Sequence, residues 1–202
     1  MKSFNLSPNA CLDRTVEGFY HTHYLGFGVP GNPDYLNHLK NTHDNFSDHK
    51  LGSALKQLLP ILAHDLTKLV SVAGLSHAWV CCVPRAKALK NYSDNQLLFS
   101  SCVSLVAKSD SCLRDGVDFI KRHTSTRTTH LKRYDSEGAL PYCGITRDTC
   151  NFSPAVAGKD IILVDDIYTK TVNIVEDAVQ ALFDNGAKSV RVYTVANTLK
   201  KY

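Results

Sequence analysis

The sequence of 202 residues contains no apolar run near the ~18–20 residues that a membrane-spanning helix requires. Its N-terminus lacks the continuous apolar segment of a secretory signal. None of the seven cysteines is arranged as a CxxC pair, and the chain is long enough to build its own core. We therefore expect reduced thiols rather than a disulfide scaffold, in a cytoplasmic protein with no membrane partner.

An excess of charge of one sign is also missing. Lys and Arg total 23 against 19 for Asp and Glu, a formal net charge of +4. This excess is too small to predict nucleic-acid binding from bulk charge. Apolar residues make up 44% and charged residues 21%, which is ordinary for a globular protein and argues against disorder. The length predicts one medium domain, or a domain with a small hood.

The first part of the chain shows little regular pattern until its end. Residues 1–50 are polar, and the Gly and Pro residues of FGVPGNP are typical of loops. Apolar residues three and four apart predict an amphipathic helix over residues 53–70. Pro60 lies inside it and predicts a kink or two shorter helices. We expect residues 1–70 to form a loop-rich and helical segment that is part of a hood.

The middle of the chain predicts two strands and a helix. The apolar run HAWVCCV at residues 77–83 is typical of a buried strand, and GVDFIK at residues 116–121 predicts a second short strand. Ser93 and Gln96 have the spacing of a capping box, which predicts a helix over residues 95–108.

A polar stretch without clear periodicity follows, rich in Arg, Lys and Thr. A structureless stretch of roughly thirty residues inside a compact domain is unusual, and such stretches are often lids or binding loops. We expect residues 123–155 to form a flexible hood loop.

The clearest unit lies near the C-terminus. DIILV at residues 160–164 predicts a continuous apolar strand, and residues 165–171 a polar turn. A helix is expected over residues 172–185, ended by Gly186, followed by a strand over residues 189–195. Such a βαβ unit builds parallel sheets with right-handed crossovers.

Two adjacent carboxylates, Asp165 and Asp166, directly follow the apolar strand. Open α/β sheets bind ligands beyond the carboxyl ends of their strands. The turn leads into a helix N-terminus, whose free N–H groups favour a phosphate, and Thr169 and Thr171 add hydroxyl donors. Because adjacent carboxylates can accept hydrogen bonds from vicinal hydroxyls, the combination fits a ribose 5-phosphate.

Other interpretations of the acidic pair explain less of the sequence around it. An apolar strand ending in two Asp is also typical of a Walker B segment, but the accompanying GxxxxGK[ST] is absent from the sequence. A receiver-type phosphoacceptor requires an acidic pair after an earlier strand, and we find none. A structural N-cap accounts for one Asp but not for the second.

Several segments resemble one family. IILVDDIYTKTVN resembles the motif by which type I phosphoribosyltransferases bind 5-phosphoribosyl 1-pyrophosphate (PRPP). AWVCCVP with the helix after it is similar to the "VPVP … FNQ" region of the ComF-type members, and VDFIKRHTSTRTTHLKR resembles their basic hood segment. The resemblance covers about residues 70–202. It implies an α/β fold with a mainly parallel open sheet, helices on both faces and a small hood, with a transferase-like core at residues 71–202.

The resemblance also implies roles for the residues of the motif. Asp165 and Asp166 would hold the ribose hydroxyls of PRPP. The residues that would wrap its 5′-phosphate are Thr169, Lys170, Thr171 and Asn173. Mg²⁺ would bridge diphosphate and ribose oxygens, so that both carboxylates would act on the metal through the ligand.

Basic residues outside the motif fall at other positions of the family pattern. Arg85 and Lys87 lie where such enzymes place the pyrophosphate loop, and cations there would balance the diphosphate. Lys132 and Arg133 lie in the hood segment and are the implied catalytic residues. The implied activity is transfer of ribose 5-phosphate to a nitrogen acceptor with release of pyrophosphate. A homodimer is considered as a further partner.

The chain departs from the family pattern at several places. Thr171 stands where Gly is usual, Asn173 replaces Thr or Ser, and "FNQ" is Asp94-Asn95-Gln96 here. Thr128 lies near the place of the hood Gln, and the N-terminal four-Cys zinc element of many ComF-type proteins is missing. These departures motivate a second hypothesis, a non-catalytic PRPP- or nucleotide-sensing regulatory protein linked to DNA uptake or nucleotide metabolism.

A basic cluster in the polar stretch motivates a third hypothesis, a nucleic-acid-binding protein. Its members are Arg122, Arg127, Lys132 and Arg133. A lid over a phosphate ligand is the favoured explanation, because the ribose-phosphate motif lies downstream.

Two groups of His and Cys could hold a metal. They are His21 and His23 with Cys11, and Cys143 with Cys150. Neither has the ligand spacing of a zinc finger, so exposed loop histidines and ordinary thiols explain them more simply.

Overall fold

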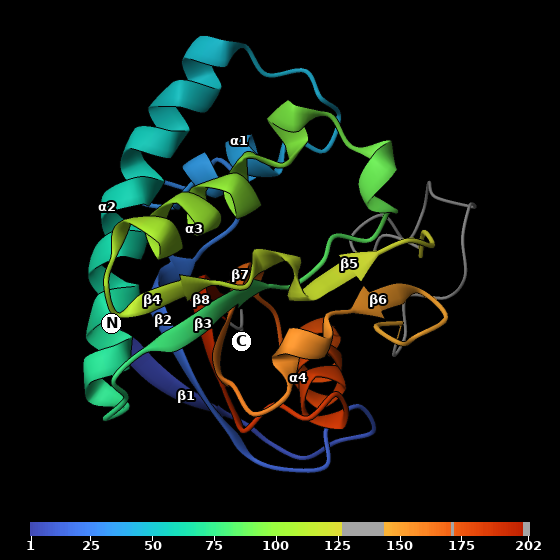
Figure 1. The fold of residues 1–202 in the computed structure, drawn as a ribbon. Helices are drawn as coiled ribbons and strands as arrows, with labels where there is room; N and C mark the ends of the chain where they lie inside the picture. The colour runs from blue at the N-terminus through green and yellow to red at the C-terminus, as the bar shows by residue number, and fades with distance from the viewer. Residues whose placement is uncertain (127–143, 171, 200–202) are drawn as a thin grey trace.

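A six-stranded sheet in the order β1-β2-β8-β7-β3-β4 forms the centre of the computed structural model, which describes residues 1–126, 144–170 and 172–199 (Figure 1). The strands are β1 (Lys2–Leu6), β2 (Val16–Tyr24), β3 (Ala78–Cys82), β4 (Leu113–Asp115), β7 (Asp160–Tyr168) and β8 (Ser189–Thr198). β1 runs antiparallel to β2, and every other neighbouring pair is parallel. The predicted α/β class with a mainly parallel sheet is confirmed.

Helices cover both faces of this sheet. α1 (Tyr35–Lys40), α2 (Asp48–Val72) and α3 (Leu98–Ser109) pack on one face, and α4 (Ile174–Asp184) packs on the other (Figure 1). The sheet therefore separates two apolar cores.

The central strand β7 shows why the sheet forms where it does. Residues 161–164 are buried among residues of both cores, as is typical of a parallel strand covered on its two faces. The strand predicted over residues 160–164 is present but continues to Tyr168, because its last residues keep their parallel pairing with β8. The expectation that a turn begins at residue 165 is therefore wrong.

α2 is longer than predicted and is one helix rather than two. Its leucines at 58, 62 and 66 are fully buried against the sheet. Pro60 and Lys56 both lie on the exposed side of α2. Because proline has no N–H group, the backbone carbonyl of Lys56 lacks its usual helical hydrogen bond. Water can replace that bond, so the proline is tolerated inside the helix.

The N-terminal segment was predicted to be loop-rich, and this is wrong for residues 2–6 and 16–24. β2 pairs in parallel with β8, so this segment belongs to the same sheet as the later strands. Gly18 makes room for a neighbouring ring, since a Cβ there would lie 2.5 Å from Cζ of Phe4. The expected boundary at residue 70 falls within α2.

The strand predicted over residues 116–121 is only partly correct. The sheet strand after α3 is β4, which the sequence analysis missed. A 3₁₀ turn, η3 (Val117–Phe119), follows, and then β5 (Ile120–Arg122) pairs antiparallel with β6 (Cys150–Phe152) in a separate small sheet. The described residues also form the 3₁₀ turns η1 (Leu89–Asn91), η2 (Asp94–Gln96) and η4 (Pro154–Val156).

The predicted capping-box pair belongs to η2 rather than to α3, with Ser93 as the N-cap and Gln96 as the last residue of the turn. The Gln96 side chain accepts a hydrogen bond from the Ser93 N–H at 3.2 Å. The 3₁₀ turn thus takes the first residues that were assigned to the helix, and α3 begins at Leu98.

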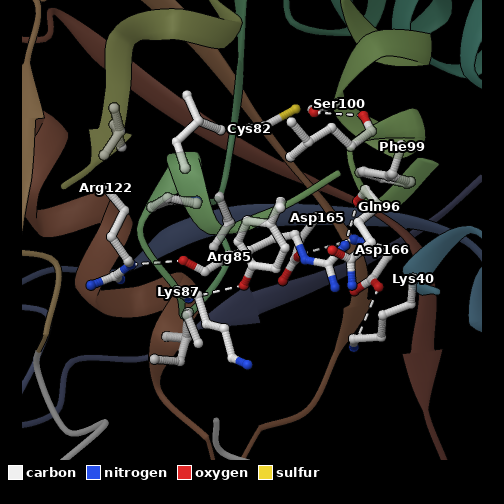
Figure 2. Close-up of a pocket in the computed structure, with 18 of the residues that line it drawn as sticks. Lys40, Cys82, Arg85, Lys87, Gln96, Phe99, Ser100, Arg122, Asp165 and Asp166 are labelled. Carbon is white, nitrogen blue, oxygen red and sulfur yellow. Dashed lines mark hydrogen bonds and ion pairs between the residues drawn. The ribbon is translucent and has the colours of Figure 1, made fainter. Parts of the chain in front are cut away.

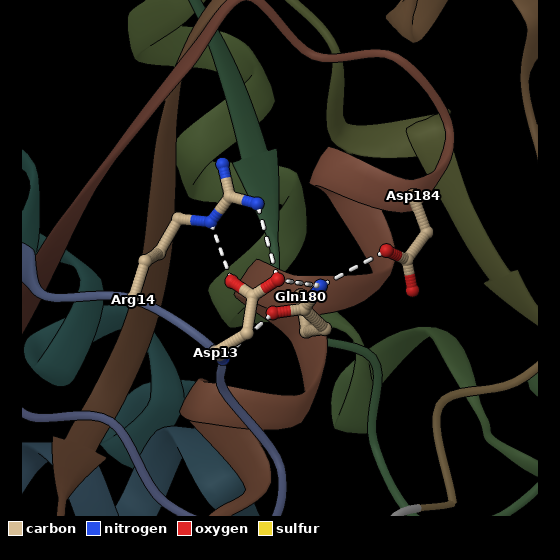
Figure 3. A network of polar contacts seen from close by, with 4 residues as sticks. All are labelled: Asp13, Arg14, Gln180 and Asp184. Carbon is tan, nitrogen blue, oxygen red and sulfur yellow. Dashed lines mark hydrogen bonds and ion pairs between the residues drawn. The ribbon is translucent and has the colours of Figure 1, made fainter.

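The loop between β1 and β2 is fastened onto α4 by exposed polar contacts (Figure 3). Arg14 pairs with Asp13 at 2.6 Å, and the Asp13 N–H donates to the side chain of Gln180 at 3.0 Å. Gln180 in turn donates to Asp184 at 2.9 Å. The Arg14 guanidinium lies 4.2 Å from the ring centroid of Phe183, so it also covers an apolar ring.

The expectation of reduced thiols is only partly correct. The structure describes free thiols at Cys81, Cys82, Cys102, Cys112 and Cys150. Cys11 is disulfide-bonded, which chain length and the lack of a CxxC pair do not exclude. Across the described ranges, no helix combines the length and the apolar character that crossing a membrane demands.

Candidate functional site

A cavity of about 980 Å³ opens at the carboxyl ends of β3 and β7 (Figure 2). The pairing of these two strands ends where Cys82 meets Val164. β7 continues beyond this point, so Asp165 and Asp166 have no neighbouring strand on the β3 side and line the cavity instead. The acidic pair thus faces the cavity at the carboxyl end of the sheet, which is where open α/β sheets bind their ligands.

Each carboxylate of the pair also accepts a hydrogen bond from a backbone N–H group. The Asp166 N–H donates to Oδ1 of Asp165 at 2.9 Å, and the Ile167 N–H donates to Oδ1 of Asp166 at 2.7 Å. An ionised carboxylate offers about four acceptor positions, so both side chains keep acceptor capacity toward the cavity. These bonds orient the two side chains before any ligand arrives.

Lys40 is a site residue that the sequence analysis missed. Its Nζ lies 3.4 Å from Oδ2 of Asp166, and the two side chains are 32% and 17% exposed. Asp166 foremost, and Asp165 after it, raise the pKa of Lys40 against the effect of burial. Burial and the adjacent Asp166 raise the pKa of Asp165, and Lys40 opposes that rise.

Arg85 is held by the segment that follows β3. Its Nη1 donates to the backbone carbonyl of Gln96, and its guanidinium carbon lies 4.4 Å from the ring centroid of Tyr92. The Tyr92 hydroxyl accepts the N–H of Lys87 at 2.9 Å. The Gln96 amide donates to the backbone carbonyl of Asn41 at 3.1 Å, which ties this segment to the end of α1.

Arg122 lines the cavity but serves the framework. Its side chain donates to the backbone carbonyl of Arg85 at 2.7 Å and to that of Gly144 at 3.0 Å. Arg122 is only 4% exposed, so it cannot contribute to the basic surface patch considered above. Its guanidinium instead joins the segment after β3 to the segment before β6.

The turn between β7 and α4 is the place expected for a phosphate. Thr169 lines the cavity, and its Oγ1 lies 2.9 Å from Oγ1 of Thr198. Lys170 is exposed beside it. Asn173 precedes α4 with a φ of 59°, a left-handed conformation that Asn adopts more readily than a β-branched Thr.

The first turn of α4 contains two buried carboxylates. Glu176 accepts the Tyr168 hydroxyl at 2.7 Å, and its Oε2 has no hydrogen-bond partner among the residues that the structure describes. Asp177 accepts the N–H of Ile145 at 2.7 Å and so holds the segment before β6. Burial raises the pKa of both carboxyls.

The structure brings most of the expected site residues together. Those that line the cavity are Arg85, Lys87, Asp165, Asp166 and Thr169. Lys170 and Asn173 lie in the adjoining turn. The expected hood residues Lys132 and Arg133, and also Arg127, Thr128, Cys143 and Thr171, lie outside the described residues.

The carboxylate oxygens of the acidic pair suit a divalent cation that is bound together with an anionic ligand. Asp165 and Asp166 offer the hard oxygen ligands that Mg²⁺ prefers. In the described ranges no group of three or more His, Cys, Asp or Glu is placed to hold a metal, so the remaining ligands would come from the bound anion and water. His21, considered above for a metal, lies instead 2.9 Å from Asp65.

A scan against protein-family models finds no match for this chain, and neither does a search of curated proteins. The functional argument therefore depends on the cavity and on the residues that line it.

Proposed function

We propose that the chain is a phosphoribosyltransferase of the type I class, closest to the ComF-type family. It would bind PRPP in the cavity and transfer ribose 5-phosphate to a nitrogen acceptor. The observation that carries the proposal is the position of Asp165 and Asp166, beyond the end of β3 and beside the N-terminus of α4. The cavity of about 980 Å³ is at the upper end of ligand-pocket volumes, so it has room for a sugar diphosphate and an acceptor.

The charges in the cavity match the two halves of this ligand. The carboxylates of Asp165 and Asp166 accept hydrogen bonds from the vicinal ribose hydroxyls. The start of α4 offers backbone N–H groups and the positive end of its dipole to the 5′-phosphate. Arg85 and Lys87 line the same cavity and would balance the diphosphate.

In the proposed reaction the C1–O bond to pyrophosphate breaks and a C1–N bond forms. The electron pair of the broken bond leaves with pyrophosphate, and Mg²⁺, when bound, would neutralise part of its charge. The work of the protein is to orient the ribose, exclude water and balance charge on the leaving group. The ring of Tyr92, whose centroid lies 4.4 Å from the guanidinium carbon of Arg85, helps to position one of the cations that would balance the leaving group.

A non-catalytic PRPP or nucleotide sensor is the second candidate. One contact favours it: the Arg85 guanidinium already donates to the Gln96 carbonyl, which draws part of its hydrogen-bonding capacity away from a leaving group. Such a protein would bind PRPP and release no pyrophosphate.

A magnesium-dependent PRPP titration by calorimetry tests the shared part of both candidates. The double variant Asp165→Asn with Asp166→Asn should lose PRPP binding and keep the circular dichroism spectrum of the folded protein. Asp184→Asn serves as the control, because it removes a carboxylate from the exposed end of α4, outside the cavity. Unchanged affinity in the double variant would sink the ribose-site assignment.

Pyrophosphate release then separates the two candidates. Acceptor-dependent release from PRPP, screened with a panel of nitrogen bases, supports the enzyme, and binding without release supports the sensor. If PRPP does not bind while DNA binds with a steep loss of affinity in salt, the third hypothesis replaces both.

A further inference from the structure

Lys40 belongs to the N-terminal segment, yet its ammonium group lies inside the candidate site. Figure 2 shows the side chain reaching the acidic pair from α1. No motif of the sequence assigned it a role, and the proposed ribose and phosphate contacts leave it unused.

The base from which Lys40 projects is rigidly built. α1 ends at Lys40, and the next residue, Asn41, is fully buried in a left-handed conformation. The Asn41 side chain accepts the N–H groups of Asn45 at 3.1 Å and Phe46 at 3.3 Å. Its backbone carbonyl accepts the Gln96 amide at 3.1 Å. The backbone from which the Lys40 side chain projects is therefore held in place by the fold.

The electrostatic setting of Lys40 explains what it does without a ligand. Two adjacent carboxylates at the edge of the sheet repel one another, and the Lys40 ammonium lies 3.4 Å from one of them. Arg85 is a second cation that lines the same cavity, and its charge disfavours that of Lys40. The positive charge of the same ammonium repels a divalent cation that approaches Asp166.

We propose that Lys40 is an exchanging counter-ion of the site. Without ligand it neutralises Asp166 and disfavours Mg²⁺ at the acidic pair. When the anionic ligand arrives with Mg²⁺, the ammonium leaves Asp166 and binds a phosphate or diphosphate oxygen, so metal and anion enter together. The inference depends on the proposed function for the identity of the anion, but its first prediction concerns Mg²⁺ alone.

Calorimetric titration of Mg²⁺ alone is the primary test. Lys40→Met should bind Mg²⁺ about fivefold more tightly than the wild type, because the metal no longer displaces an ion pair of roughly 1 kcal/mol. Lys40→Arg keeps the positive charge and should stay near the wild-type affinity. Lys108→Met is the matched control, since it removes a similar Lys–Asp pair, at 3.1 Å from Asp115, and Lys108 does not line the cavity.

The second arm titrates Mg²⁺–pyrophosphate and Mg²⁺–PRPP into the same variants. Here Lys40→Met should lose affinity about tenfold, the opposite direction from its effect on Mg²⁺ alone, because a charge-assisted contact to the anion is missing. Lys108→Met should bind as the wild type does.

The outcomes separate this inference from the proposed function. Unchanged Mg²⁺ affinity in Lys40→Met overturns the exchange, even where anion binding falls. Tighter Mg²⁺ binding with unchanged binding of both anions overturns the transfer of Lys40 to the ligand. Tighter Mg²⁺ binding together with weaker pyrophosphate binding supports the exchange even where PRPP itself does not bind, and in that case only the proposed function fails.

Discussion

Tyr193→Phe tests how one buried carboxylate joins three parts of the fold. Asp65 on α2 is 1% exposed, and its Oδ2 accepts the Tyr193 hydroxyl on β8 at 2.9 Å. The same oxygen lies 2.9 Å from Nδ1 of His21 on β2. Burial and the charge of Asp65 raise the pKa of Tyr193, so the phenol keeps its proton and donates it. The carboxylate thus links β2, α2 and β8.

The magnitude follows from which atoms the variant removes. Tyr193→Phe deletes the hydroxyl and keeps the ring, so the packing of the core changes little. Tyr193 is fully buried, and water therefore cannot replace the lost donor. A hydrogen bond to a charged group contributes about 1.5–3 kcal/mol, so we expect the free energy of unfolding to fall by about 2 kcal/mol. The Asp65 oxygen keeps its 2.9 Å contact with Nδ1 of His21, so the loss stays below the ~3–5 kcal/mol of a broken buried ion pair.

Urea unfolding followed by circular dichroism measures this difference. Tyr24→Phe is the matched control, because its hydroxyl donates at 3.1 Å to the neutral, partly buried side chain of Asn37. The control should lose about 0.5–1 kcal/mol. A loss below about 0.5 kcal/mol in Tyr193→Phe, or equal losses in the two variants, would refute the argument that the Asp65 charge strengthens the bond.

Three further predictions concern the same framework. Leu62→Ala should lower the free energy of unfolding by about 2–5 kcal/mol in urea, because Leu62 is fully buried between α2 and the sheet, and a loss under 1 kcal/mol would contradict that packing. Burial raises the pKa of Glu176 in the folded protein above its ordinary value of 4.5. The contribution of the Glu176 carboxyl to the free energy of unfolding is therefore full below pH 4.5 and is lost as the pH rises through the pKa of the folded state. Glu176→Gln should therefore flatten the fall of stability between pH 4 and pH 8, and parallel wild-type and variant curves would exclude this cause. A fragment of residues 71–202 should lack a cooperative unfolding transition, because it loses β2 and the buried leucines of α2, whereas native-like unfolding of the fragment would show that residues 1–70 are dispensable.

The C-terminal βαβ unit could be predicted because its signals are local. The continuous apolar run of β7, the amphipathic helix and Gly186 at its end each act within a few residues. The placement of Asp165 and Asp166 at the cavity follows from the same unit. Their inclusion in β7 could not be predicted, because it depends on how far β8 continues to pair.

The remaining strands depend on contacts between distant segments. β2 contains Gly18 and two histidines, which break the apolar pattern of a strand, and it forms because β8 offers a free edge. β4 has only three residues, too few for a periodic signal, and is defined by its pairing with β3. Lys40 is a similar case, because its role depends on the packing of a six-residue helix near Asp166.

The N-terminal segment therefore contributes chemistry as well as structure to the candidate site. Its leucines in α1 and α2 share one apolar core with β3, β7 and β8. The same packing that buries Leu39 at the end of α1 delivers its neighbour Lys40 to Asp166. A residue that joined the site through a separate mobile hood could leave it without cost to the core. Because α1 packs into the core, the proposed exchange of the Lys40 ammonium between Asp166 and a ligand needs a change of its side chain alone and no change of fold.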